Sequence, residues 1–203
     1  MSAPRPQRPT LPRMDEIELL SGIMTKTGDL IAGMPPGTEH GQSPCPDYDA
    51  AGMVRHLVGW VRSFEAAANG RTFDGDPSDV EVSDDPAAQF RASADALVAG
   101  WRQHGFDREV AMTGAPQPAE SVFNMTVMEY LTHGWDLAVA TGQPVPYSEA
   151  EAQEVLRRAE GTLPPQYRGG DMPFGEIVPV PDDAPAVDRL VGFMGRDPAA
   201  ASR

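Results

Sequence analysis

Four stretches of the chain repeat apolar residues every three or four positions, and breaks rich in glycine or proline separate them. This spacing places the apolar side chains along one face of a helix. It predicts four long helices, over residues 14–33, 49–68, 85–104 and 120–141. About 20 residues give a helix of roughly 30 Å, and helices of similar length that each carry an apolar face are typical of a four-helix bundle. We therefore expect an all-α fold of this kind.

The sequence after the fourth helix predicts a short helical extension. Ser148-Glu-Ala-Glu151 has the spacing of a capping box and predicts a fifth helix that ends near Leu163. Asp183-Ala-Pro185 can begin a last short helix that runs to Met194. Between these helices, Ile177-Val-Pro-Val180 is a short β-like run.

The remaining segment lies before the first helix. Residues 1–13 contain four prolines and three arginines without apolar periodicity, so we expect a disordered or extended arm. A chain of this length usually forms one domain. We expect that domain, the bundle with its extension, to cover residues 14–198.

Composition excludes several classes of function. The chain has 16 Lys and Arg against 30 Asp and Glu, a formal charge of −14. Such an acidic chain is not expected to bind nucleic acid or an anionic membrane surface. No run approaches the roughly 18 apolar residues of a membrane span, and the start lacks the apolar core of an export signal. With Cys45 as its single cysteine, it forms no intrachain disulfide, and we expect a cytoplasmic protein.

Ionisable residues occur on helix faces that should be buried. His56 lies between Met53 and Trp60 on the apolar face of the second helix. On the fourth helix, Glu129 and His133 are four residues apart and therefore share one face, and Asp136 follows on the same face. Burying such groups is costly unless their charges and hydrogen bonds are compensated.

Two arrangements would compensate these groups. A divalent metal ion could be bound by His56, Glu129 and His133, because two imidazoles and one carboxylate are the ligand set of open catalytic zinc sites. Alternatively, Glu129 and a histidine could form a buried hydrogen-bonded pair without a metal. The Glu-x-x-x-His spacing is common by chance, so spacing alone leaves both arrangements open.

Other ionisable residues give weaker signals. His104 precedes a helix-ending glycine, where the helix dipole explains it, and His40 lies in a glycine-rich loop and is expected to be solvated. Cys45 is flanked by prolines, and no helix N-terminus or positive neighbour is evident that would lower its pKa.

Three segments carry a resemblance to a known family. They are Ser43-Pro-Cys-Pro-Asp-Tyr-Asp49 with Met53-Val-Arg-His-Leu-Val-Gly59, then Met128-Glu-Tyr-Leu-Thr-His-Gly-Trp-Asp-Leu-Ala-Val-Ala-Thr-Gly142, and finally Phe174-Gly-Glu-Ile-Val-Pro-Val-Pro-Asp-Asp-Ala-Pro185 with Asp188-Arg-Leu-Val-Gly-Phe-Met-Gly-Arg196. Together they resemble the actinobacterial, metal-binding branch of the DinB-like superfamily. They are similar to the N-terminal domain of mycothiol-dependent maleylpyruvate isomerase, and the resemblance spans roughly residues 14–198.

The resemblance implies a DinB-like four-helix bundle with a divalent metal ion near one end. Residue by residue, the family's metal ligands fall on His56, Glu129 and His133. The resemblance also implies a chemistry, in which the metal binds a small thiol, here mycothiol, as its thiolate. Zinc is the expected metal, and nickel and iron accept the same ligands. The isomerase has a further C-terminal domain that helps to form its substrate site, whereas residues 142–203 follow a different pattern, so the resemblance does not extend to maleylpyruvate as substrate.

Two functions are compatible with this resemblance. The first is a metal- and thiol-dependent transferase or isomerase that acts on a small electrophile, in which Asp136 orients a ligand histidine and Arg55 and Arg62 are candidate anchors for a substrate carboxylate. The second is a metal-binding protein without catalysis, with a stress or regulatory role. We also expect a homodimer, because Trp135 and Val139 lie outside the main apolar faces.

Overall fold

The computed structural model describes residues 15–112, 114–170 and 174–201. The arm expected at residues 1–13 lies outside the described residues. Within them the fold is all-α, as predicted. The bundle consists of α1 (Glu16–Ala32), α2 (Ala50–Ala68), α3 (Pro86–His104) and α4 (Ala119–Thr141).

Of the smaller elements, only α5 and α6 were predicted from the sequence. The extension contains α5 (Glu149–Thr162), α6 (Ala186–Phe193) and α7 (Pro198–Ala201), and two 3₁₀ turns occur at η1 (Pro77–Asp79) and η2 (Pro165–Tyr167). The described part of the chain has one small sheet, in which β1 (Glu109–Val110) pairs antiparallel with β2 (Gln117–Pro118). This sheet lies in a segment that has no strand pattern in the sequence.

Acidic and hydroxyl side chains set most of the helix starts. The carboxylate of Asp15 accepts hydrogen bonds from two backbone N–H groups of α1, and Asp49 and Asp85 each accept one at the starts of α2 and α3. Ser148 and Glu151 form the predicted capping box of α5. Local sequence therefore defines where these helices begin, and packing then decides how they meet.

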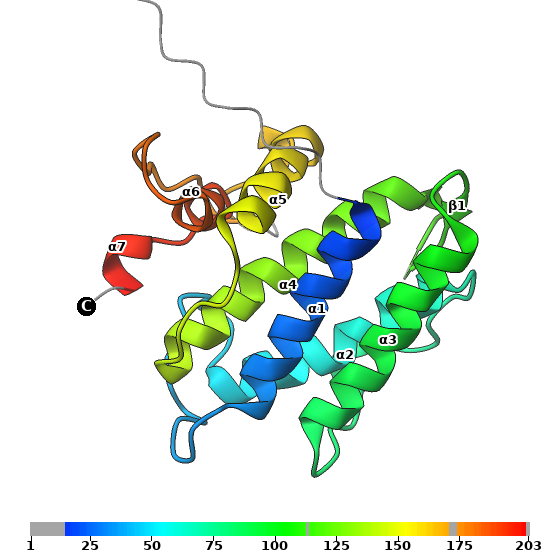
Figure 1. Ribbon diagram of the computed structural model, residues 1–203, viewed down its shortest axis with the longest axis horizontal. Helices are drawn as coiled ribbons and strands as arrows, with labels where there is room; N and C mark the ends of the chain where they lie inside the picture. The colour runs from blue at the N-terminus through cyan, green and yellow to red at the C-terminus, as the bar shows by residue number, and fades with distance from the viewer. Residues whose placement is uncertain (1–14, 113, 171–173, 202–203) are drawn as a thin grey trace, which may run out of the picture.

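The four long helices do not pack in simple chain order. Helices α1 and α2 each pack against both α3 and α4, so α1 and α2 lie on opposite sides of the bundle. Figure 1 shows α1 in front of α2, with α3 and α4 on either side of them. The core between them is rich in large, fully buried side chains, among them Phe90, Trp101, Phe123 and Tyr130. Burial of each such side chain contributes about 1.5–3 kcal/mol to stability.

The extension packs against one side of the bundle. Helix α5 packs on α4, and α6 packs on α5, which Figure 1 shows as a separate layer beyond α4. The β-like run at 177–180 does not form a strand. Its backbone is instead fixed by a hydrogen bond from the Val178 N–H to the Gly192 carbonyl at 2.9 Å, and Gly192 lies in α6. This segment therefore bonds to a helix and not to a second strand.

Two sequence expectations about the surface need comment. Trp135 is buried in the core, 3% exposed, and was therefore wrongly assigned to an exposed face; Val139 is partly buried against the same core. The burial of Trp135 removes one reason to expect a homodimer, and the homodimer stays a prediction. Among the described residues, no helix is long and apolar enough to cross a bilayer.

Candidate metal site

The structure brings His56, Glu129 and His133 together between α2 and α4. The His56 Nε2 and Glu129 Oε1 atoms are 2.5 Å apart, and the His133 Nε2 atom is 3.6 Å from the same oxygen. One ligand atom from each of the three lies within 4.8 Å of the others. Their side chains are between 12% and 24% exposed, so the group is largely buried and still reachable by solvent.

Helix geometry places these three side chains. Glu129 and His133 are one helical turn apart on α4, and His56 faces them from α2. The neighbouring residues fix the approach of the two helices, because the hydroxyl of buried Tyr130 donates to the Leu57 carbonyl at 3.4 Å. This bond, between the residue after Glu129 and the backbone of the residue after His56, links α4 to α2 beside the group.

The electrostatics keep Glu129 in its charged form. Burial alone would raise the pKa of the Glu129 carboxyl, but the charge of His133 and the hydrogen bond from His56 outweigh it and lower the pKa to about 2. Glu129 is therefore a carboxylate at neutral pH. Two imidazole nitrogens and one carboxylate oxygen fit a divalent ion such as zinc and leave a position open for a further ligand. The donor set thus suits the metal implied by the resemblance.

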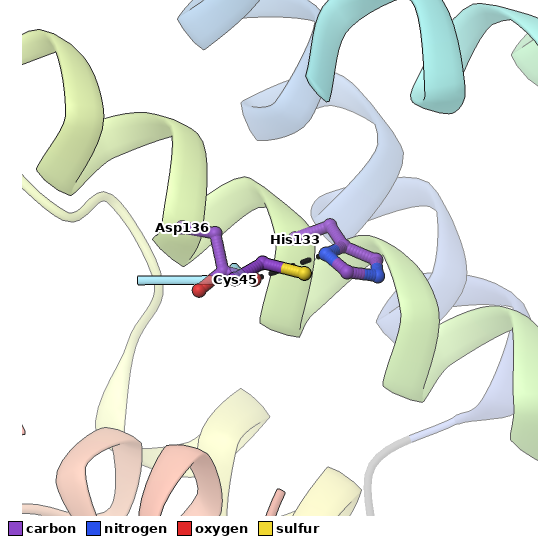
Figure 2. Close-up of side chains that lie close together, drawn as sticks. All are labelled: Cys45, His133 and Asp136. Atoms are coloured by element: carbon purple, nitrogen blue, oxygen red, sulfur yellow. Dashed lines mark hydrogen bonds and ion pairs between the residues drawn. The ribbon is translucent and has the colours of Figure 1, made fainter. Parts of the chain in front are cut away.

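Asp136 contacts His133, as expected for a residue that orients a ligand histidine. Its side chain is 0% exposed, and its Oδ2 atom lies 3.0 Å from His133 Nδ1 (Figure 2). The guanidinium of Arg196 pairs with the same carboxylate, at 2.8 Å from Nη2 to Oδ2. Arg196 lies in the C-terminal segment that carries the resemblance, but the sequence did not predict its contact with Asp136. The need of buried Asp136 for a cation was the signal that could have found it.

Cys45 is the second residue whose place the sequence did not reveal. Its thiol, His133 and Asp136 each offer a ligand atom within 4.8 Å of the others, and Figure 2 shows the sulfur beside the imidazole ring. Burial raises the pKa of this thiol. Asp136 already holds the Arg196 guanidinium. The Cys45 cluster is therefore a poorer cation site than the first group, because a cation there would compete with Arg196.

The loop before α2 carries Cys45 and an aromatic wall of the site. The loop is closed by an antiparallel bridge between Gln42 and Asp49. The ring of Tyr48 lies 4.8 Å from the His56 ring and 6.4 Å from the His133 ring, between centroids. The Trp60 ring lies 6.0 Å from His56. Aromatic rings thus flank the histidines and limit the access of water to them.

The remaining candidates lie elsewhere. His40 is exposed and pairs with Asp49, 3.1 Å from Nδ1 to Oδ2, and His104 is exposed at the end of α3. His40 is thus exposed to solvent, as expected, and His104 lies in the last turn of α3, where the helix dipole favours a positive charge. Arg55 and Arg62 are exposed on α2, and the guanidinium of Arg62 lies over the Phe73 ring. Their role as anchors for a substrate carboxylate stays a prediction.

Comparison with known proteins shows which family the chain is similar to. A family model described as the mycothiol maleylpyruvate isomerase N-terminal domain matches residues 20–138, which include all three of the grouped residues. Uncharacterized proteins from two strains of Mycobacterium tuberculosis are each 28% identical over 171 residues, covering 82% of this chain and 90% of theirs. No solved structure matches the chain significantly.

Proposed function

The chain belongs to the family of the mycothiol maleylpyruvate isomerase N-terminal domain, and on this premise we propose that it binds a divalent metal ion through His56, Glu129 and His133 and uses a small thiol to attack a small electrophile. The observation that carries the proposal is the convergence of these three side chains, from two helices, within 4.8 Å. Mycothiol is the thiol that the family description suggests. The reaction class is transfer or isomerisation.

The residues of the site have separate tasks in this proposal. His56, Glu129 and His133 hold the ion, and Asp136 fixes the His133 ring through the contact at Nδ1. When bound, the ion supplies the positive charge that lets a thiol lose its proton at neutral pH. Tyr48 flanks both histidines and Trp60 flanks His56, so these rings limit the access of water to the site. The net charge of −14 repels anions at long range, so the proposed electrophile is not strongly anionic.

The metal and the compartment belong to the same proposal. Zinc suits two imidazoles and one carboxylate, and nickel or iron would accept the same ligands. The cytoplasm keeps small thiols reduced, which the reaction requires. Maleylpyruvate is not part of the proposal, because residues 139–203 lie outside the family match.

The first test is metal binding. We expect the purified protein to hold close to one zinc ion per chain, measured by mass spectrometry of the metal. His133→Ala should lose the ion and melt at lower temperature, because metal bound to the folded state adds about 2.7 kcal/mol at 100 times its Kd. His104→Ala, on the exposed end of α3, is the matched control and should change neither. Full metal occupancy in His133→Ala would contradict the assignment.

The second test separates catalysis from binding alone. The metal-loaded protein is mixed with mycothiol and a chromogenic electrophile, and consumption of the thiol is followed. We expect a rate above the uncatalysed one that disappears with His133→Ala or with chelator and persists with His104→Ala. A metal-loaded protein that accelerates neither the consumption of the thiol nor the thiol-dependent conversion of the electrophile would favour the alternative, a non-catalytic metal-binding protein.

A further inference from the structure

Asp136 is a buried carboxylate with two partners that come from different parts of the chain. One partner is His133, one turn away on α4. The other is Arg196, which follows α6 and pairs through both Nε and Nη2, at 3.3 Å and 2.8 Å from Oδ2. A carboxylate that is 0% exposed is stable only when its charge is compensated. The residue that compensates it belongs to the extension and lies outside the family match.

The end of α6 delivers Arg196 to this position. The chain turns at Gly195, whose φ of +88° is a conformation that few side chains tolerate, and a Cβ there would lie 3.0 Å from the Gly175 Cα. The Arg196 N–H then donates to the Val191 carbonyl at 2.8 Å. The Arg196 Nη1 donates to the Met194 carbonyl, also at 2.8 Å. The Nη1 atom of the guanidinium is thus bound by its own segment, while Nε and Nη2 face Asp136.

The contacts of Asp136 decide which nitrogen of His133 is free. The Nδ1 atom is 3.0 Å from Asp136 Oδ2, an acceptor, and 3.5 Å from Arg196 Nη2, a donor. The nearer contact is a hydrogen bond only if Nδ1 carries a proton that it donates to Asp136. In the neutral ring, which is the form that binds a metal, the proton-free nitrogen is then Nε2, the atom that faces Glu129. Such a carboxylate contact on the far nitrogen is typical of metal-ligating histidines.

We propose that Arg196 is a positioning residue of the metal site: it holds Asp136, which holds His133 with Nε2 toward Glu129. The C-terminal extension thereby becomes part of the site. This inference rests on the proposed metal binding by His56, Glu129 and His133. It makes a prediction opposite in sign to simple electrostatics. Removal of a nearby positive charge should strengthen cation binding by Coulomb's law, whereas removal of a positioning residue should weaken it.

The experiment measures zinc affinity by competition with a chromophoric chelator. Arg196→Met should weaken binding about 10- to 100-fold, and Arg196→Lys, which keeps the charge but loses the two-point contact, should recover part of the loss. Arg189→Met is the matched control. Arg189 lies on α6 and bonds to the Ala184 carbonyl and to Gln153, away from Asp136, so its affinity should equal that of the unaltered protein.

A double-mutant cycle tests the route through Asp136. Asp136→Asn should also weaken binding, and Arg196→Met added to it should have little further effect, because both changes break the same chain of contacts. The absorption spectrum of the cobalt-substituted protein should change with Arg196→Met and not with Arg189→Met. Circular dichroism and melting in chelator identify any variant that fails to fold, and for such a variant Arg196→Lys and Asp136→Asn carry the test.

The outcomes separate the two proposals. Unaltered protein that binds no zinc would overturn the proposed function. Zinc binding by the unaltered protein with equal or tighter affinity in folded Arg196→Met would overturn only the role of Arg196. Additive effects in the cycle would also overturn it, because Arg196 would then act independently of Asp136.

Discussion

Cys45 shows how much a residue's role depends on its surroundings. The sequence offers a lone thiol between two prolines, and the structure buries it, 6% exposed, beside His133 and Asp136. A buried thiol has a raised pKa and is a poor nucleophile. Cys45 is therefore a poor candidate for the reacting sulfur of the proposed chemistry, which agrees with the proposal that a bound small thiol supplies it.

We expect Cys45 to react slowly with iodoacetamide in the native protein. Burial limits both access and thiolate formation, so the rate at neutral pH should be roughly tenfold or more below that in urea. Because Cys45 is the single cysteine, mass spectrometry of the labelled protein reports on it alone. Cys45→Ser provides the unlabelled control. Equal rates in the native and unfolded protein would show that the thiol is accessible, and would reopen Cys45 as a nucleophile.

At the level of the helix, Gly134 decides how α4 meets its neighbours. Gly134 directly follows His133 and faces the Tyr147 hydroxyl, which bonds to Thr27 on α1 at 2.9 Å and to the Tyr130 carbonyl at 3.2 Å. A Cβ at position 134 would overlap with the Tyr147 hydroxyl. The glycine weakens the helix on its own but permits a tyrosine to join α1 and α4.

Gly134→Ala should therefore destabilise the protein, although alanine is the better helix former. We expect a loss of about 1–3 kcal/mol in the free energy of unfolding, because the tyrosine has to move out of a packed core. Gly161→Ala is the control on α5, where a Cβ would meet no atom within 4 Å, and it should be neutral or stabilise by about 0.5–1 kcal/mol. Urea unfolding measures both. A stabilised Gly134→Ala would mean that Tyr147 is not held against α4.

Across the whole molecule, the sequence predicts what depends on local pattern. Periodicity predicts the four helices to within two residues at most ends, and the i,i+4 spacing correctly puts Glu129 and His133 on one face. The grouping of His56 with these two residues required their shared burial and the resemblance as well, because periodicity alone does not pair distant segments. Arg196 and Asp136 are 60 residues apart, and the contact depends on how α6 packs on α5. Cys45 reaches His133 through a loop that has no periodicity. The β1–β2 pair is too short to leave a strand pattern.

The contact between α1 of the bundle and α5 of the extension depends on a buried carboxylate, Glu151. Glu151 on α5 forms an ion pair with Lys26 on α1 and accepts hydrogen bonds from the Ser148 backbone at 2.7 Å and the Ser148 hydroxyl at 2.6 Å. Its side chain is 7% exposed. Burial acts to raise the pKa of Glu151, but Lys26 and Ser148 outweigh it and lower the pKa below 4.5. A lowered carboxyl pKa stabilises the folded state above the unfolded value and ceases to do so as pH falls through the folded one.

Glu151→Gln should therefore lose about 1.5–3 kcal/mol in the free energy of unfolding at pH 7, because charged hydrogen bonds contribute about that much. The difference from the unaltered protein should be constant above pH 5.5 or so and shrink as the pH falls below about 4.5, where the unfolded carboxyl binds a proton first. Glu160→Gln, on the exposed side of α5, is the control and should stay within about 0.5 kcal/mol at every pH. Urea unfolding between pH 3 and 7 measures both variants. A Glu151→Gln difference that stays unchanged down to pH 3 would show that shape, and not charge, joins α5 to α1.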